Sequence, residues 1–473
     1  MNYPERIRSF QSIEVIPDTP GKRQISGTVR IRTSSGTEDF RIIYRYSGNI
    51  QADRRMAGMM ITMPVINFTY FAGELKLDFP LSENDLELIR DFCTINNTEV
   101  FVNKICRRRY EFFRKEFLPD ESEITEENAK GSTVVTATAD PVESRFPGSQ
   151  YSSDRIAVLS SGGKESLLSY GMLTELGMNV YPVFFNESGG HWRTAKTSYD
   201  HMSGQNGNTV RIWSNVDRFY AFMLRKITAL DQSAIRKRAD TYPLQAFIFP
   251  VYVMASLPLI IGNGISGIIM GNEFDDPREM PPYRSIRHYY GVYDQSQDFA
   301  SRISEYFGRS GVQCKLYSLV YPIAGNVVQR ILGHRYPELF ETQRSCHSCH
   351  FSRGKIEPCG KCTKCIGIML FAGAAGLDLE KIGYHGMTAE RIVSTAAKAR
   401  MRLDPDELNY LIARISGRET RDHDHVTGIH VLPSEDTELS MVPEHLRNGI
   451  AGILRRYSSG TYILRNNQWV LKG

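Results

Sequence analysis

Two short stretches of this sequence contain residues whose types and spacing suit chemistry. The first is RIAVLSSGGKESLLSY, residues 155–170, in which an apolar run ends in a serine- and glycine-rich turn before a helical pattern. Glycines let backbone N–H groups approach a phosphate, and the helix that follows turns its positive end toward that anion. A tight turn with a capping serine explains the same residues equally well. Taken alone, the stretch leaves both interpretations open.

The candidate groups for phosphate binding are hydroxyls, backbone amides and one lysine. The stretch lacks the Gly-x-x-x-x-Gly-Lys-Ser/Thr pattern, so it does not fit the P-loop of kinases and GTPases. Lys164 adds a positive charge, although its side chain could equally point into solvent. The candidates for contact with a phosphate are Ser161, Gly162, Gly163, Lys164 and Ser166.

The second stretch is RSCHSCHFSRGKIEPCGKCTKC, which contains five of the eight cysteines. Cys-x2-Cys turns place two thiolates on one tetrahedral Zn²⁺. Three cysteines at three-residue intervals and one more upstream would complete a site of four thiolates. Such a site leaves no position for a substrate, so we expect a structural metal. The fifth cysteine is then a spare or a reactive thiol, and His347 and His350 are expected not to be ligands.

The composition of the chain limits its class and its compartment. It has 473 residues, of which 41% are hydrophobic and 23% charged, which favours two or three folded domains over extended disorder. The net charge of +4 is too balanced to indicate nucleic-acid binding. No run of ~18 apolar residues occurs, and the N-terminus lacks the layout of a signal peptide. We therefore expect a cytoplasmic protein without a membrane partner, whose reduced thiols bind metal.

The elements that must position these residues change in character along the chain. Within residues 1–130, GTVRIRTSSGTEDFRIIYRYSG predicts a hairpin, and SENDLELIRDFCTI predicts a helix with a capping serine. We expect an N-terminal α+β domain there, without a chemical motif. Residues 131–154 are rich in Ser, Thr, Gly and Pro and predict a linker.

From residue 155 the pattern alternates between strands and helices. RIAVLS and NVYPVFF flank the helical KESLLSYGMLTELG, while TVRIW and GIIMG predict two more buried strands. This alternation predicts an α/β fold with a doubly wound parallel sheet, in which ligands bind at the carboxyl ends of the strands. We place this domain at residues 155–385. Residues 386–473 are expected to be a helical extension with a terminal hairpin at GTYILRNNQWVL.

The loop SGGKES resembles the Ser-Gly-Gly-x-Asp-Ser loop of the N-type ATP pyrophosphatases, the PP-loop superfamily. Members of that superfamily have an adenine nucleotide alpha hydrolase-like fold, adenylate a substrate and release pyrophosphate. Their loop binds the pyrophosphate part of ATP, and its acidic residue helps to place Mg²⁺. Glu165 stands here where aspartate is usual, so the carboxylate is one methylene further out. The resemblance implies ATP and Mg²⁺ as ligands and Lys164 and Glu165 as catalytic residues.

A zinc cluster downstream of such a loop resembles the 7-cyano-7-deazaguanine synthase family. That family has Ser-Cys and, after an interval, Cys-Gly-x-Cys-x-x-Cys. The resemblance covers residues 155–379, about half the chain. FFNESGGH, residues 184–191, stands where the family has Phe-Asp-Tyr-Gly-Gln-x-His, which implies Phe184 and His191 at the nucleotide. By the same resemblance, the zinc ligands are Cys349, Cys359, Cys362 and Cys365.

The substrate end departs from that family. After the fourth strand the chain reads GNEFDDPREMPPYRS, whereas the family has Gly-Ala-Asn and a longer nucleobase-binding run; Gly271, Asn272 and Asp275 match. Polar residues that follow a strand are expected at the substrate, and they are explained equally well as turn or capping residues. The candidates are Asn272, Glu273, Asp275 and Asp276.

The resemblance implies an ATP-dependent ligase that forms C–N bonds. It would convert a small carboxylate such as 7-carboxy-7-deazaguanine into an acyl-adenylate, releasing pyrophosphate, and then into an amide, a nitrile or a conjugate with release of AMP. The additional N-terminal domain favours a different or larger acceptor, either a protein or a tRNA, and the oligomeric state is open between a monomer and a homodimer.

Two other functions stay open. One is a tRNA-modifying PP-loop enzyme of the thiolase type, with Cys346 as the sulfur carrier. The other is a zinc-stapled ATP-binding module without turnover. Because members of the wider family occur in bacterial defence gene clusters, antiviral defence is an expected setting for each of these functions.

Overall fold

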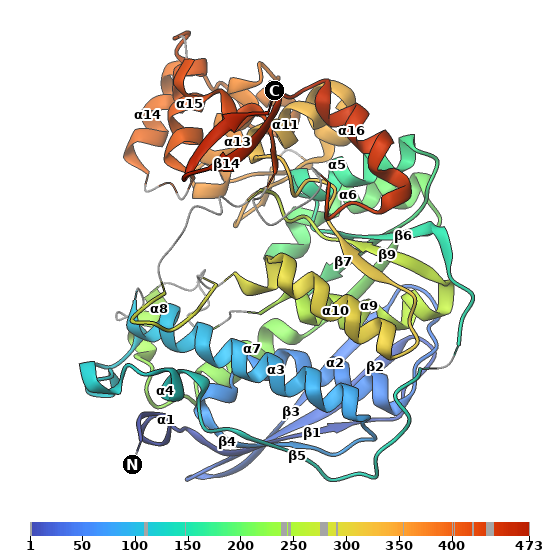
Figure 1. The fold of residues 1–473 in the computed structure, drawn as a ribbon, viewed down its shortest axis with the longest axis vertical. Helices are drawn as coiled ribbons and strands as arrows, with labels where there is room; N and C mark the ends of the chain where they lie inside the picture. Colours follow the sequence, from blue (N-terminus) through green and yellow to red (C-terminus); the bar gives the residue numbers. More distant parts are fainter. Residues whose placement is uncertain are drawn as a thin grey trace. The chain divides into compact units, whose positions relative to one another are not determined.

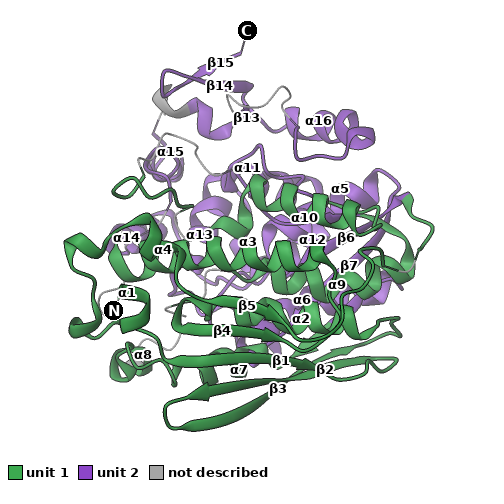
Figure 2. Cartoon of the chain, turned by 60° about the horizontal axis from the view of Figure 1, so that its bottom comes forward, with its two compact units in different colours: residues 1–152, 212–266, 281–315 green, residues 153–211, 267–280, 316–473 purple. Residues whose placement is uncertain are grey.

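The computed structural model describes residues 2–107, 112–146, 148–237, 244, 247–274, 282–289, 292–352, 354–399, 401, 403–418, 421–431 and 439–472. The chain divides into two compact units (Figure 2), each made of three segments. Unit 1 contains residues 1–152, 212–266 and 281–315, and unit 2 contains residues 153–211, 267–280 and 316–473. The expected domain of residues 155–385 is therefore interrupted, because two of its segments belong to unit 1.

Unit 1 contains strands in the order β8-β3-β2-β1-β4-β5. The predicted hairpin is formed by β2 (Gln24–Thr33) and β3 (Gly36–Tyr46), which pair antiparallel. β1 (Phe10–Pro17) pairs antiparallel with β2 and parallel with β4 (Ala72–Leu77). The predicted strand TVRIW is β8 (Val210–Ser214), and it pairs antiparallel with β3, with Tyr44 opposite Ser214. At this pairing, the expectation of a parallel sheet differs from the structure.

Three helices of unit 1 can be understood from their own sequences. The predicted helix SENDLELIRDFCTI is α3 (Glu83–Glu99), and Ser82 caps it in a capping box with Asp85. α2 (Arg54–Ile66) and α9 (Phe249–Asn263) are buried along almost their whole length. α9 ends at Gly264 in the left-handed conformation, with φ of 61°. Because α9 is apolar on all sides, it can be stable only inside a core.

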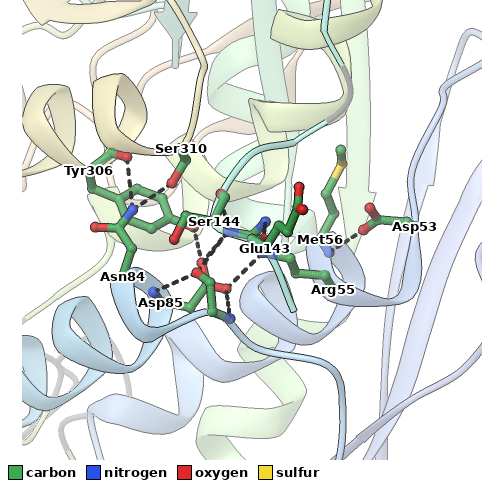
Figure 3. Close-up of polar contacts among 10 residues, drawn as sticks. Asp53, Arg55, Met56, Asn84, Asp85, Glu143, Ser144, Tyr306 and Ser310 are labelled. Atoms are coloured by element: carbon green, nitrogen blue, oxygen red, sulfur yellow. Dashed lines mark hydrogen bonds and ion pairs between the residues drawn. The ribbon is translucent and has the colours of Figure 1, made fainter. Parts of the chain in front are cut away.

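A buried arginine binds residues 143–144 to this unit (Figure 3). The guanidinium of Arg55 donates to both carboxylate oxygens of Asp85, at 2.7 and 2.9 Å, and to Ser82 Oγ at 3.1 Å. It also donates to the carbonyl oxygens of Glu143 at 3.0 Å and Ser144 at 2.8 Å. Because Arg55 is buried and pairs with the buried carboxylate of Asp85, we assign this charge a structural role.

The segment expected to be a linker, residues 131–154, is therefore partly ordered within unit 1. It contains β5 (Val134–Ala137), which pairs parallel with β4. Downstream of β5, the Arg55 contacts hold the backbone at residues 143–144. The composition of the segment did not reveal these contacts, because they depend on groups supplied by α2 and β4.

Unit 2 contains strands in the order β10-β9-β6-β7. β6 (Ser152–Ser160) and β7 (Asn179–Asn186) are parallel, with Ile156 opposite Val180. They are joined by α5 (Lys164–Glu175), which is the predicted strand–helix–strand unit (Figure 1). β9 (Ile265–Ile269) contains most of the predicted strand GIIMG, and β10 (Lys315–Tyr317) lies next to it in the order. The prediction of the α/β class is confirmed.

The C-terminal residues of unit 2 are helical only in part. α14 (Ala389–Lys398), α15 (Pro405–Ile415) and α16 (Arg447–Arg455) agree with the predicted extension. A small sheet adds β13 (Ile429–Val431), β14 (Thr461–Arg465) and β15 (Gln468–Leu471). β14 and β15 form the predicted hairpin, and both residues of its turn, Asn466 and Asn467, have positive φ.

The remaining elements connect these parts. In unit 1 they are α1 (Tyr3–Arg6), η1 (Thr69–Phe71), η2 (Val100–Cys106), η4 (Lys115–Phe117), η5 (Glu121–Glu123), α4 (Glu126–Lys130), α7 (Val216–Leu224), α8 (Gln232–Lys237), η6 (Tyr293–Gln295) and α10 (Gln297–Arg309). In unit 2 they are α6 (Gly189–Gln205), α11 (Gly325–Arg335), α12 (Pro337–Thr342), β11 (His350–Ser352), β12 (Lys355–Glu357), α13 (Thr363–Ala374), η7 (Leu379–Ile382), η8 (Arg421–Thr427) and η9 (Glu444–Leu446). Among the described residues, no helix is both long and apolar enough to span a bilayer.

Candidate functional site

The glycine loop joins the end of β6 to the first turn of α5. Gly162 has φ of +74°, a conformation that favours glycine. A Cβ at this position would lie 3.0 Å from Ser198 Oγ and 3.2 Å from Ala195 Cα, both on α6. Conformation and space therefore both require glycine here. The loop packs its backbone against α6 and leaves Ser161 exposed.

The N-terminus of α5 has the properties of an anion site. Gly163 is its N-cap residue and makes no side-chain capping bond. The first N–H groups of this twelve-residue helix, together with its dipole, favour a negative group at the loop.

The hydroxyls of Ser160 and Ser166, which flank the loop, form hydrogen bonds at the turn. Ser160 Oγ donates to Ser166 Oγ at 3.1 Å, and Ser166 Oγ donates to the carbonyl oxygen of Gly163 at 3.1 Å. Ser166, predicted to contact phosphate, makes these bonds within the turn, and its role toward a phosphate stays a prediction. Ser160 was not among the predicted residues, although its place at the end of the strand before the loop was a usable signal.

Lys164 points inward, with 5% of its side chain exposed. Its ammonium group pairs with the carboxylate of Glu165 and lies 2.7 Å from Glu273 Oε2. The ring centroid of Phe371, on α13, lies 5.2 Å from the same nitrogen. Burial alone would lower the pKa of Lys164, but the two carboxylates outweigh it and raise the pKa. The lysine therefore stays charged.

Glu273 follows β9 and has about a third of its side chain exposed. Desolvation raises the pKa of its carboxyl group to about 7, with Glu165 and Glu407 adding to the rise and Lys164 opposing it. A Cβ on Gly325, the first residue of α11, would lie 3.1 Å from Glu273 Oε2. The N-terminus of α11 therefore comes close to this carboxylate, as does Lys164 at the N-terminus of α5.

A third carboxylate, that of Glu407 on α15, is buried, and its charge acts on Glu273. Its Oε1 accepts hydrogen bonds from the backbone N–H of Asn326 at 3.1 Å and from Asn326 Nδ2 at 2.8 Å. Burial raises the pKa of Glu407, and the bonds from Asn326 lower it. Sequence reasoning missed both residues, because they are remote from the loop in sequence and belong to no motif.

The structure places the other predicted residues in different surroundings. Phe184 is fully buried in the core, and its ring packs edge-on against Tyr199 with centroids 5.5 Å apart. His191 lies in the first turn of α6, with Nδ1 3.6 Å from Glu187 Oε1.

Of the residues predicted at the substrate, Asn272 is buried, and its backbone carbonyl oxygen accepts a hydrogen bond from Ser318 at 2.6 Å. Asp275 and Asp276 lie outside the described residues. Three of the predicted residues do lie together: Glu165 and Glu273 both pair with the ammonium group of Lys164. We call these three residues the lysine cluster.

A group of four thiols forms a candidate metal centre in unit 2. The Sγ atoms of Cys346, Cys359, Cys362 and Cys365 all lie within 4.8 Å of one another. Three of the separations are 3.5, 3.8 and 4.0 Å. Four thiolates 2.3 Å from one zinc ion would be about 3.8 Å apart. The donor set and its spacing therefore fit a metal such as zinc.

The fourth cysteine of this group is Cys346, which corrects the assignment of Cys349. The sulfur of Cys349 lies 3.6 Å from Thr194 Oγ1 and 3.9 Å from the carbonyl oxygen of Arg344. The sulfur of Cys346 instead accepts hydrogen bonds from the backbone N–H groups of Ser348 and Cys359, each at 3.2 Å. The chain turns around Cys346 and directs its sulfur toward the other three, a path that the spacing of the cysteines does not reveal.

Helix α6 connects the metal centre to the glycine loop. Thr194 Oγ1 donates to the carbonyl oxygen of Cys346 at 3.0 Å, and Ser198 Oγ donates to that of Thr342 at 3.1 Å. A Cβ on Gly163 would be 3.9 Å from Ser345 Oγ. A metal held by the four thiols would therefore fix the segment that contributes Ser345 beside the loop.

The cluster can thus bind a metal, and the loop has the geometry to accept an anion beside a buried, charged lysine. No protein-family model matches the chain, and no curated protein matches its sequence.

Proposed function

We propose that this protein is an ATP-dependent ligase of the 7-cyano-7-deazaguanine synthase type. It adenylates a carboxylate, releases pyrophosphate and transfers the acyl group to an amine. The observation that carries the proposal is the glycine loop before α5. The N-cap residue of this helix is Gly163, so no N-cap side chain occupies the first N–H groups that would bind a phosphate. Lys164, held next to that loop, supports it.

The chemistry follows from the poor leaving ability of hydroxide. Attack of the carboxylate on the α-phosphate of ATP breaks the bond to pyrophosphate and leaves an acyl-adenylate, whose AMP group departs readily. The N–H groups of the first turn of α5 hold the pyrophosphate, and the charge of Lys164 lowers the energy of the transition state.

Glu165 is the residue that would hold Mg²⁺. A Cβ on Gly163 would lie 3.0 Å from Glu165 Oε2, so the carboxylate lies over the loop, and carboxylate oxygens are suitable ligands for this ion. When bound there, Mg²⁺ would neutralise the negative charge that develops on the departing pyrophosphate. The four cysteines would hold zinc in a structural role, because four thiolates complete its coordination.

The test uses ATP, Mg²⁺, 7-carboxy-7-deazaguanine and ammonium chloride with the full chain. AMP and pyrophosphate are the expected products, in equal amounts. Release of ADP and phosphate would contradict the proposal. Binding of ATP without AMP in the presence of any carboxylate would favour a non-catalytic module instead.

The thiolase alternative receives less support from the cysteines. Cys346, its expected sulfur carrier, belongs to the four-thiol group. The remaining thiol of the cluster, Cys349, is 2% exposed. A sulfur carrier has to reach its acceptor, and this thiol is enclosed.

A further inference from the structure

We propose that Glu273 is the proton acceptor for the amine that attacks the acyl-adenylate. The inference rests on the proposed function and assigns it one more catalytic residue. It also defines the acceptor chemically, as an amine that enters the site as a cation.

The reaction requires a base, because an amine is mostly protonated near neutral pH and an ammonium ion has no lone pair. One N–H proton passes to the carboxylate of Glu273. The nitrogen then forms a bond to the acyl carbon, and the bond from that carbon to the oxygen of AMP breaks, with its electron pair leaving on AMP. A second proton of the former ammonium passes to solvent, which leaves a neutral amide. Glu273 returns its proton to solvent before the next turnover.

The positions of the three carboxylates select Glu273 for this role. Glu165 lies over the glycine loop, on the pyrophosphate side. Glu407 is 8% exposed, and Asn326 occupies one of its oxygens with two hydrogen bonds. Glu273 has 34% of its side chain exposed, whereas Lys164, bound 2.7 Å away, has 5%. Of the two paired side chains, Glu273 is therefore the one that an incoming amine can reach, and Lys164 is the enclosed one.

The charges around Glu273 favour a cationic ligand. Lys164 and Glu165 face it from α5, Glu407 acts on it from α15, and Gly325 brings the N-terminus of α11 close. Two of these carboxylates pair with the one lysine, and the charge of Glu407 acts on Glu273 in addition, so an ammonium ion that enters would offset the repulsion among the three. Burial raises the pKa of Glu273, which makes its carboxylate more ready to take up a proton than an ordinary surface glutamate.

The experiment compares two nucleophiles on the full chain. Ammonia is mostly ammonium at neutral pH, whereas hydroxylamine is mostly unprotonated and needs no base. With ATP, Mg²⁺ and 7-carboxy-7-deazaguanine, Glu273→Gln should slow ammonia-dependent AMP release by about 10²- to 10⁴-fold. It should keep hydroxamate formation from hydroxylamine and carboxylate-dependent ATP–pyrophosphate exchange. Glu273→Asp should recover part of the ammonia rate.

Glu175→Gln is the matched control, because it removes a carboxylate at the other end of α5, where Glu175 pairs with Arg335. It should leave the rates with both nucleophiles unchanged. If Glu273→Gln slows both nucleophiles equally, or abolishes the exchange reaction, Glu273 acts in adenylation or only in structure, and the inference is overturned. If the wild-type chain shows neither exchange nor AMP, the proposed function itself fails, and the inference fails with it.

Discussion

The ammonium group of Lys164 lies 2.7 Å from the carboxylate of Glu273, although 109 positions separate the two residues in the sequence. This ion pair links the first turn of α5 to the residues that follow β9. In the proposed ligase, it links the group that stabilises the phosphates to the group that accepts the proton of the amine.

Lys164→Met should lower AMP formation by about 10²- to 10³-fold, because the proposed site loses a buried positive charge on the first turn of α5, next to the loop. The pKa of Glu273 should rise further, since Lys164 now lowers it. The measurement is AMP release as a function of pH. Lys381→Met is the control, because Lys381 forms a surface ion pair with Glu341 at 2.8 Å. A Lys164→Met variant with the control's rate would contradict the role of this lysine.

Gly162→Ala should abolish ATP binding, measured by calorimetry, while Gly177→Ala should retain it. Both glycines have φ of 74°, so alanine strains both sites alike, by about 1–2 kcal/mol. At Gly162 the added Cβ also meets α6, whereas at Gly177 it meets no atom within 4 Å. Equal loss of binding in the two variants would mean that helix stability, not the loop, is responsible.

Cys346→Ser should lower the zinc content of the purified protein, and Cys349→Ser should leave it unchanged. The reason is that Cys346, and not Cys349, belongs to the group of thiols within 4.8 Å of one another. Zinc per chain is measured by elemental analysis after dialysis. The opposite result would restore Cys349 as the fourth ligand.

Arg55→Met should destabilise unit 1 by about 3–5 kcal/mol, because it leaves the buried carboxylate of Asp85 without its counter-charge. Arg55 is 5% exposed, and Asp85 is fully buried. Urea unfolding measures the loss. Arg30→Met, which breaks the exposed pair with Asp39, is the control and should have little effect. Similar unfolding curves for the two variants would contradict the structural role of Arg55.

Acid should weaken the C-terminal part of unit 2 through His430. This ring is buried, stacks on Phe274 with centroids 3.9 Å apart, and burial lowers its pKa to about 3, with His425 contributing. The unfolded chain takes up a proton below the ordinary value of 6.5, whereas the folded chain does not. Stability should therefore fall as the pH drops from about 6.5 toward 3, by up to about 5 kcal/mol.

The matched pair for this prediction is His430→Phe and His445→Phe, since His445 is exposed. His430→Phe should flatten the dependence of unfolding free energy on pH in this range. His445→Phe should keep it. An unchanged slope in His430→Phe would show that other groups cause the acid sensitivity.

Much of the local structure could be predicted from the chain. Ser82 caps α3, the asparagines at 466 and 467 form the turn of the last hairpin, and Gly162 and Gly163 lie between β6 and α5 as expected. Each of these features depends on hydrogen bonds or periodicity within a few residues, so the neighbouring sequence carries the information. The cysteine spacing indicated a metal centre for the same reason.

The composition of the candidate site depended instead on contacts between distant segments. Whether Lys164 points into solvent or inward depends on Glu273, and Glu407 joins the cluster only because α15 packs in the same unit. The choice of Cys346 over Cys349 depends on the path of the backbone, and β8 lies antiparallel to β3 because of pairing between residues 44 and 214. These features depend on burial and on contacts between distant segments. The desolvation of a charge and the approach of four sulfur atoms are set by residues that are far away in the sequence, so the residues around each position do not reveal them.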